Sequence, residues 1–377
     1  MQFSEIVGQG AVKQRLLNSF HDGRLSHAQL FLGPEGCGSL ALAIAYSQYI
    51  NCSQKTAVDS CGTCSSCMKY KGLVHPDLHF VFPIITSPKF KEPVSDNYIA
   101  EWRKLNVQTN SQFNLNHWLE CIDAENKQGS IQKNESTEIN RKLNLKTYEA
   151  DYKTMIIWMA DKMNETCANK ILKILEEPPP NTLFILISEN TDAILATILS
   201  RTQIVKIPKI DKESMLGYIS QHYGLTGEEA LFVADNANGN ILSAQSIVSM
   251  SEEMGLFFES FTTLMRKSYQ RDFEGLIDWS KQVSTWGREK QKTYLEYCLV
   301  MIRNNFVMNQ KATGILHMSK MESDFSNKFS VFITDSNIEE FSVLLSDAHF
   351  HIERNGSAKI IFLDMALKIA ILFAKKR

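Results

Sequence analysis

Four cysteines near the N-terminus have the spacing of a metal site. The motif is C-x8-C-x2-C-x2-C, formed within sixteen residues by Cys52, Cys61, Cys64 and Cys67. Four thiolates suit a tetrahedral Zn²⁺ ion and leave no open coordination position, so such a site is structural. The metal would stabilise a loop that is too small to fold alone. The sequence therefore predicts a zinc module over residues 50–70, with free thiols or a redox-active C-x-x-C pair as the alternatives.

A glycine-rich turn has the pattern of a loop that cradles phosphate. Its glycines are Gly33, Gly36 and Gly38. A working phosphate loop places a lysine and then a serine or threonine after its last glycine, to hold the phosphates and Mg²⁺. Here those places hold Ser39 and Leu40, which supply neither the charge nor a metal ligand. We predict a degenerate loop that only packs, and a weak nucleotide site is the alternative.

Arg201 follows Ser200 at the end of a short predicted helix. Its guanidinium group could bind two oxygens of a γ-phosphate held by a neighbouring subunit. An arginine at this place could also neutralise the C-terminus of the helix or pair with a surface acid. The residue type alone leaves both interpretations open.

The elements that must position these residues alternate between strand and helix. Strands are predicted at Gln29–Leu32, Met155–Met159, Leu183–Ser188 and Gln203–Ile207, and helices at Ser39–Ile50, Lys162–Glu177 and Ala193–Ser200. The strands are short and apolar throughout, as strands buried on both faces are. Three prolines, Pro178–Pro180, end the long helix. The pattern predicts an α/β fold with a parallel sheet.

The remaining sequence predicts further domains and one insertion. Residues 87–150 are polar, and short helices are expected there at Ala100–Leu105 and His117–Ile122. Beyond residue 207 the apolar pattern is helical, with one helix expected at Ile241–Met250. We predict an α/β domain over residues 1–207, a small helical domain over 208–250 and an all-α domain over 251–377.

Length, charge and composition limit the classes of protein to which the chain could belong. The chain has 377 residues, of which 44% are apolar and 22% charged, and its formal charge is −2. These values are ordinary for a globular protein of more than one domain, and they exclude a strongly basic nucleic-acid-binding surface over the whole chain. We expect no membrane span and no secretory signal. The eight cysteines then indicate a reducing, cytoplasmic location and metal before disulfides.

The run ANKILKILEEPP, followed by TILSR, resembles the clamp-loader branch of the AAA+ family, the clamp-loader subunits of bacterial DNA polymerase III. The same cysteine spacing after a phosphate-loop helix is found in these subunits. The resemblance implies a RecA-like AAA+ domain, a small helical lid and a C-terminal collar through which subunits associate. It also implies that Arg201, with Ser200, is an arginine finger that acts in trans on a neighbour's ATP.

Active relatives carry an acidic pair at the end of a strand, and in this chain that pair falls on Trp158 and Met159, which cannot hold Mg²⁺. A sensor arginine falls on Ser243. The resemblance thus implies a subunit that does not hydrolyse ATP, with ATP only at neighbouring subunits. Its implied partners are the gamma/tau and delta subunits and, through the complex, the sliding clamp and primer-template DNA. An ATP-hydrolysing gamma/tau-type subunit and a zinc-dependent nucleic-acid binder acting alone are the alternatives.

Overall fold

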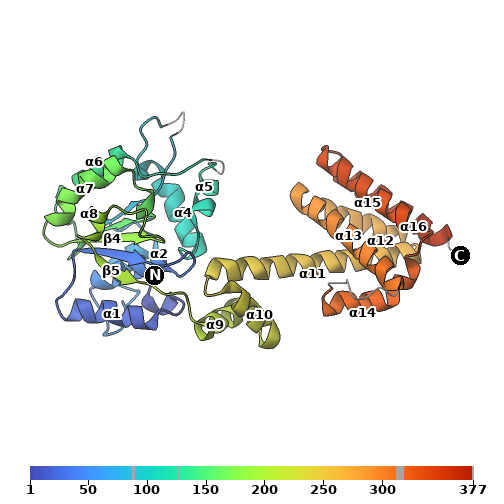
Figure 1. The fold of residues 1–377 in the computed structure, drawn as a ribbon, viewed down its shortest axis with the longest axis horizontal. Helices are drawn as coiled ribbons and strands as arrows, with labels where there is room; N and C mark the ends of the chain where they lie inside the picture. Colours follow the sequence, from blue (N-terminus) through green and yellow to red (C-terminus); the bar gives the residue numbers. More distant parts are fainter. Residues whose placement is uncertain (87–89, 125–126, 311–317, 376–377) are drawn as a thin grey trace. The chain divides into compact units, whose positions relative to one another are not determined.

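The computed structural model of the chain describes residues 1–86, 90–124, 127–310 and 318–375. Two compact units are present, Met1–Val248 and Ser249–Arg377. The first contains the sheet, and the second is helical (Figure 1). Among the described helices, none has the combination of length and apolar character that crossing a bilayer requires.

A five-stranded sheet forms the centre of the first unit. Its strands are β1 (Ala28–Leu32), β2 (Leu78–Val81), β3 (Lys153–Ile157), β4 (Thr182–Ser188) and β5 (Gln203–Lys206). Their order is β2-β3-β4-β1-β5, and every neighbouring pair is parallel. The predicted parallel α/β layout is confirmed. Strand β3 begins and ends earlier than expected, and Met159, which follows it, has a φ of 58° that takes the chain out of the extended conformation.

Helices cover both faces of this sheet. They are α1 (Gly10–His21), α2 (Ser39–Ile50), α3 (Ser65–Lys71), α4 (Ile99–Thr109), α5 (Leu115–Cys121), α6 (Lys133–Asn144), α7 (Glu165–Glu176) and α8 (Ala196–Leu199). Two further helices, α9 (Lys212–Tyr223) and α10 (Gly227–Ala237), form a separate apolar cluster in the same unit. One apolar core contains residues of α1, α2, α4 and α5, and the other contains residues of α6, α7 and α8. The result is a three-layer arrangement in which each face of the sheet is buried by helices.

The described residues of the polar segment 87–150, which are 90–124 and 127–150, include two fully buried tryptophans, Trp102 on α4 and Trp118 on α5, and so form part of the core of the first unit. Trp102 stacks on Phe82 with ring centroids 4.2 Å apart, and the indole N–H of Trp118 donates to the carbonyl of Pro83 over 2.7 Å. Helices α4 and α5 lie where the two short helices were expected.

Helix α11 (Ile241–Gln270) corrects the predicted end of a helix at Met250. It begins in the first unit, where Ile241 and Val248 pack with residues of α9 and α10, and runs on for twenty residues beyond Met250. The predicted boundary between residues 250 and 251 therefore falls inside a continuous helix.

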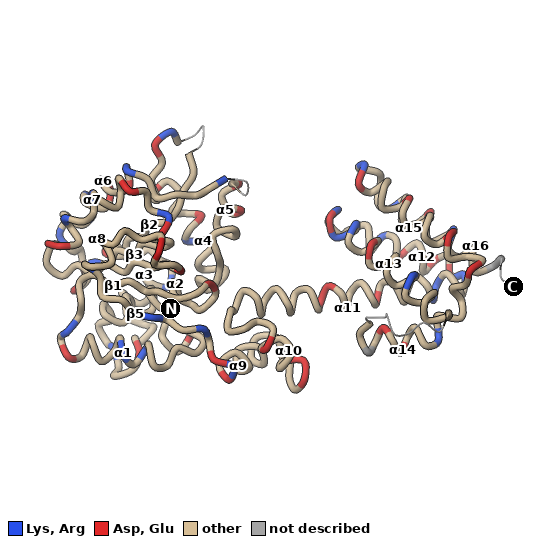
Figure 2. Tube along the Cα trace, in the orientation of Figure 1, with Lys and Arg blue, Asp and Glu red and all other residues tan. Residues whose placement is uncertain are grey.

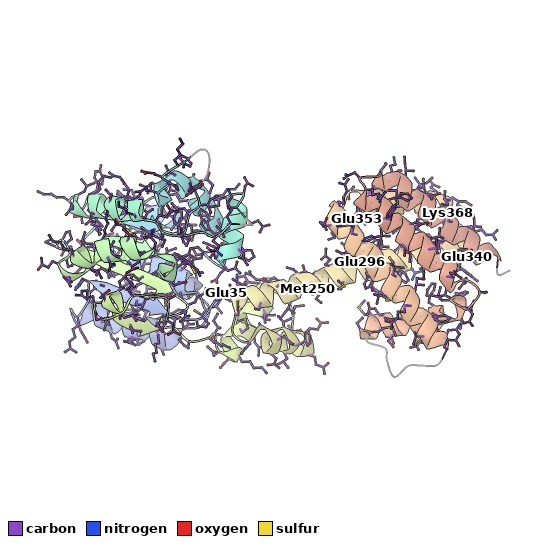
Figure 3. All side chains as sticks on the ribbon, turned by 45° about the horizontal axis from the view of Figure 1, so that its top comes forward. Glu35, Met250, Glu296, Glu340, Glu353 and Lys368 are labelled. Carbon is purple, nitrogen blue, oxygen red and sulfur yellow. The ribbon has the colours of Figure 1, made fainter. Side chains whose placement is uncertain are left out.

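The second unit is built from the rest of α11 and from α12 (Phe273–Ser284), α13 (Arg288–Asn309), α14 (Lys320–Phe329), α15 (Ile338–Glu353) and α16 (Ala358–Lys375). An aromatic-rich core holds these helices together, with Phe257, Tyr294 and Phe362 fully buried. Charged residues of both signs are interspersed along its helices (Figure 2). Four of them, Glu296, Glu340, Glu353 and Lys368, are labelled in Figure 3.

Candidate functional site

The four predicted metal ligands lie together. The sulfur atoms of Cys52, Cys61, Cys64 and Cys67 are all within 4.8 Å of one another. The Sγ of Cys52 is 3.5 Å from that of Cys61 and 3.9 Å from that of Cys64, and Cys61 is 3.9 Å from Cys67. A tetrahedral ion with metal–sulfur bonds of about 2.3 Å requires sulfur–sulfur separations of about 3.8 Å. The cluster therefore has the geometry to hold a metal ion.

Backbone N–H groups donate hydrogen bonds to the sulfurs of Cys52, Cys61 and Cys64. The N–H of Cys61 donates to Sγ of Cys52 over 3.3 Å, and that of Cys64 donates to Sγ of Cys61 over 3.3 Å. Partial burial opposes ionisation of Cys64, but hydrogen bonds from Cys67 and Ser53 lower its pKa to about 6. Such bonds stabilise thiolate, the form that binds metal.

The cysteine loop also fixes the N-terminal segment. The carboxylate of Asp59 accepts hydrogen bonds of 2.9 Å from the backbone N–H groups of Phe3 and Ser4. The side-chain amide of Gln2 donates to the carbonyl of Ser60 over 2.6 Å. Order in the cysteine loop is thus coupled to the placement of residues 2–4.

The glycine-rich turn connects β1 to α2, as a phosphate loop does. Gly36 and Gly38 have φ values of 71° and 86°, where side chains other than glycine are strained. The side-chain oxygen of Asn240 lies against Gly36, at a place where no Cβ would fit. The N–H of Ile241 donates to the carbonyl of Gly36 over 3.1 Å. The start of α11 therefore closes over the loop through direct protein contacts.

The pocket beside this loop is filled by aromatic side chains. Its free volume is only about 40 Å³, and its lining includes Trp158 and the segment Ser111–Phe113. Trp158 was expected here from the sequence, whereas Phe113 was not. The Phe113 ring lies 5.3 Å from that of Trp158 and 5.4 Å from that of Trp102. The turn before it is strained, since Asn110 and Ser111 have φ values of 49° and 59°.

The electrostatics of this pocket oppose an anionic ligand. Two carboxylates, Glu35 and Glu189, line it. Burial raises the pKa of Glu189, and the nearby carboxylates of Glu35 and Asp161 raise it further. Ser39, at the place of the lysine, is 3.0 Å from the thiol of Cys37 and brings no positive charge. Glu35 lies beside the start of α11, 3.4 Å from the Asn240 amide (Figure 3).

Arg201 is partly exposed and is not among the described residues that line this pocket. Its side chain is one-third exposed and forms an ion pair with Glu176, the last residue of α7. Its Nη1 donates to the carbonyl of Thr197 over 2.8 Å and to the hydroxyl of Ser200 over 3.2 Å. The sequence left open that Arg201 pairs with a surface acid or binds the C-terminus of a helix. Both of these contacts are present in the single chain.

Comparisons with known proteins give the relatives of this chain. The family model described as DNA polymerase III, delta subunit, matches residues 8–211. This range contains the cysteine cluster, the glycine-rich turn and Arg201. The "DNA polymerase III subunit delta'" of Bacillus subtilis is 28% identical over 207 residues, which are 55% of this chain and 50% of that protein. That of Haemophilus influenzae is 24% identical over 274 residues, 72% of this chain and 71% of that protein.

A second kind of relative matches as well. The "DNA polymerase III subunit gamma/tau" of Mycobacterium bovis is 25% identical over 233 residues, 61% of this chain. The chain spans 33% of that relative and 50% of the Bacillus subtilis one. The sequence identity of this chain to delta'-type relatives is similar to its identity to gamma/tau-type relatives. The comparisons therefore show the family but do not distinguish the type of subunit.

Proposed function

The chain belongs to the family described as DNA polymerase III, delta subunit, and from this premise we propose that it is the delta-prime-type subunit of a bacterial clamp loader. In this proposal it does not hydrolyse ATP. It assembles with delta and gamma/tau subunits in the cytoplasm, and the complex loads the sliding clamp onto primer-template DNA.

The filled phosphate-loop pocket is the observation that carries the proposal. Sites for small-molecule ligands usually have several hundred Å³, and about 40 Å³ is free here. Leu40 is buried in the apolar core, and Trp158 holds the place of a Mg²⁺-binding acid. Neither charge nor space for a magnesium–triphosphate complex is left, which favours the delta-prime type over an ATP-hydrolysing gamma/tau type.

Arg201 is the group through which this subunit would act. Placed beside the γ-phosphate of a neighbouring gamma/tau subunit, its guanidinium would neutralise charge that develops in the transition state, an effect worth roughly 10³–10⁵ in rate. In an open ring of head-to-tail subunits, one end member contributes an arginine to the ATP site of its neighbour and has no neighbour that contributes one to its own site.

The remaining parts have proposed roles in assembly. Zn²⁺ is the metal that four thiolates at this spacing suit, and its role here is structural. The helices over residues 208–250 are assigned to the lid, and the second unit to the collar through which the subunits associate. The basic residues around the cysteine loop are Lys55, Lys69, Lys71 and His75, which carry too little positive charge to favour a nucleic-acid binder acting alone.

The proposal is tested by reconstituting the complex with its gamma/tau and delta partners, clamp and primer-template DNA. With Arg201→Ala, we expect clamp-stimulated ATP hydrolysis to fall at least tenfold while the complex still assembles. Arg141→Ala is the matched control, because Arg141 is also an exposed arginine paired with a glutamate, Glu138, at 2.6 Å. Unchanged hydrolysis with Arg201→Ala would remove the finger assignment. Micromolar ATP binding to the chain alone, measured by calorimetry, would favour the gamma/tau alternative.

A further inference from the structure

The guanidinium group of Arg201 is engaged almost completely within its own subunit. Nε donates to the Glu176 carboxylate, and Nη2 pairs with the same carboxylate oxygen. Both contacts of Nη1 are to the end of α8, at the Thr197 carbonyl and the Ser200 hydroxyl. Of the five N–H donors of the group, the one on Nε and the two on Nη1 make hydrogen bonds, and Nη2 is held in the ion pair with Glu176.

Binding to a phosphate uses two parallel N–H donors of the guanidinium plane. The edge formed by Nε and Nη2 offers such a pair, and Glu176 occupies it. The bonds from Nη1 to α8 hold the opposite edge in place. Removal of the Glu176 carboxylate alone would therefore expose a complete phosphate-binding edge without moving the rest of the side chain.

The position of Glu176 argues against a role in stabilising α7. It is the last residue of that helix, where the helix dipole favours a cation and disfavours a carboxylate. Its side chain is 46% exposed and that of Arg201 33% exposed, so solvent screens the pair and weakens it. A multiply charged triphosphate with its Mg²⁺ could displace a carboxylate held this weakly.

We propose that Glu176 is a positioning residue that keeps Arg201 in a resting conformation, and that the triphosphate of a neighbouring subunit displaces the carboxylate when the shared site forms. This inference rests on the proposed role of Arg201 in trans. Glu176 thereby sets how readily the finger becomes available.

The test compares Glu176→Gln with the unmodified chain in the reconstituted complex, measuring ATP hydrolysis against ATP concentration. Because exposed ion pairs are worth about 0.2–1 kcal/mol, we expect hydrolysis at limiting ATP to rise about 1.4- to fivefold. The double variant Glu176→Gln/Arg201→Ala should match Arg201→Ala alone. Glu165→Gln removes a carboxylate from the other end of the same helix and controls for the change in net charge.

The outcomes separate the two proposals. An unchanged or lower rate with Glu176→Gln, while Arg201→Ala still abolishes stimulation, would refute the resting contact and leave the finger in place. A gain that persists in the double variant would also refute it, because the effect would not pass through Arg201. No effect of Arg201→Ala would overturn both. Thermal unfolding of each variant shows whether the chain is still folded.

Discussion

Truncation of Phe113 tests whether the aromatic filling of the phosphate-loop pocket is part of the core. The side chain is only 7% exposed, and its ring lies against Trp102 and Trp158. Removing a buried phenylalanine side chain usually costs about 3–5 kcal/mol. For Phe113→Ala we expect a loss of unfolding free energy of about 3 kcal/mol, at the low end of this range. The reason is that the strained turn at Ser111 can relax into the space that is created.

Urea unfolding of the full chain, followed by tryptophan fluorescence, measures this cost. For a slope of about 2–3 kcal/mol per molar urea, the midpoint of the first unit should fall by about 1 M or more. Phe232→Ala is the matched control, because it makes the same chemical change in the same unit at a side chain that is 63% exposed. Its effect should stay within about 0.5 kcal/mol. A Phe113→Ala midpoint equal to that of Phe232→Ala would refute the view that the turn fills the pocket as part of the core.

The remaining predictions concern the metal, two buried carboxyl groups and the nucleotide. Chelation should release zinc, measured with a metal-sensitive dye, and should speed proteolysis of the N-terminal residues that the cysteine loop holds. Burial raises the pKa of Glu135 to about 7 although hydrogen bonding to Ser95 lowers it, so its stabilising contribution is complete below pH 4.5 and is lost as the pH rises through 7. Glu135→Gln should flatten the unfolding free energy over that range. Burial opposes ionisation of Asp77, but three backbone N–H groups, of residues 148–150, lower its pKa below 3.8, so stability is lost as the pH falls through that lowered value. Asp77→Asn should cost about 1–3 kcal/mol in urea unfolding at pH 7. Phe113→Ala should still not bind ATP in calorimetry, because Leu40 and Trp158 remain.

Features encoded over short distances could be predicted from the sequence. The apolar runs gave the parallel sheet, since strands buried on both faces need apolar side chains at every position. The cysteine cluster followed from spacing alone, because C-x2-C places two sulfurs on one turn. The end of α11 at Gln270 could not be found this way, since residues 251–253 are polar without breaking the helix.

The contents of the pocket depend on long-range contacts and were only partly foreseen. Phe113 and Trp158 are far apart in sequence, and no local pattern joins them. The sequence nevertheless contained a signal that two acidic residues lie close together at this pocket. Glu189 directly follows β4, and Glu35 follows β1 by three residues. Carboxyl ends of adjacent parallel strands meet at one edge of the sheet, and β1 pairs with β4. The buried tryptophans of segment 87–150 likewise indicated a folded element in a stretch that its polar composition made look like a surface insertion.

The lack of phosphate-binding groups in the glycine-rich loop is physically related to the aromatic filling of the pocket beside it. Once Ser39, Leu40 and Trp158 replace the groups that hold triphosphate, an open site would remain as a cavity with no ligand to fill it. Such an open, polar site would hold water, whereas Phe113 and Trp158 occupy the space with buried aromatic side chains. The contact of Ile241 with Gly36 joins the loop to α11 without a nucleotide. A loop and helix that are joined without a nucleotide fit the proposal of a ring member that does not hydrolyse ATP and contributes Arg201.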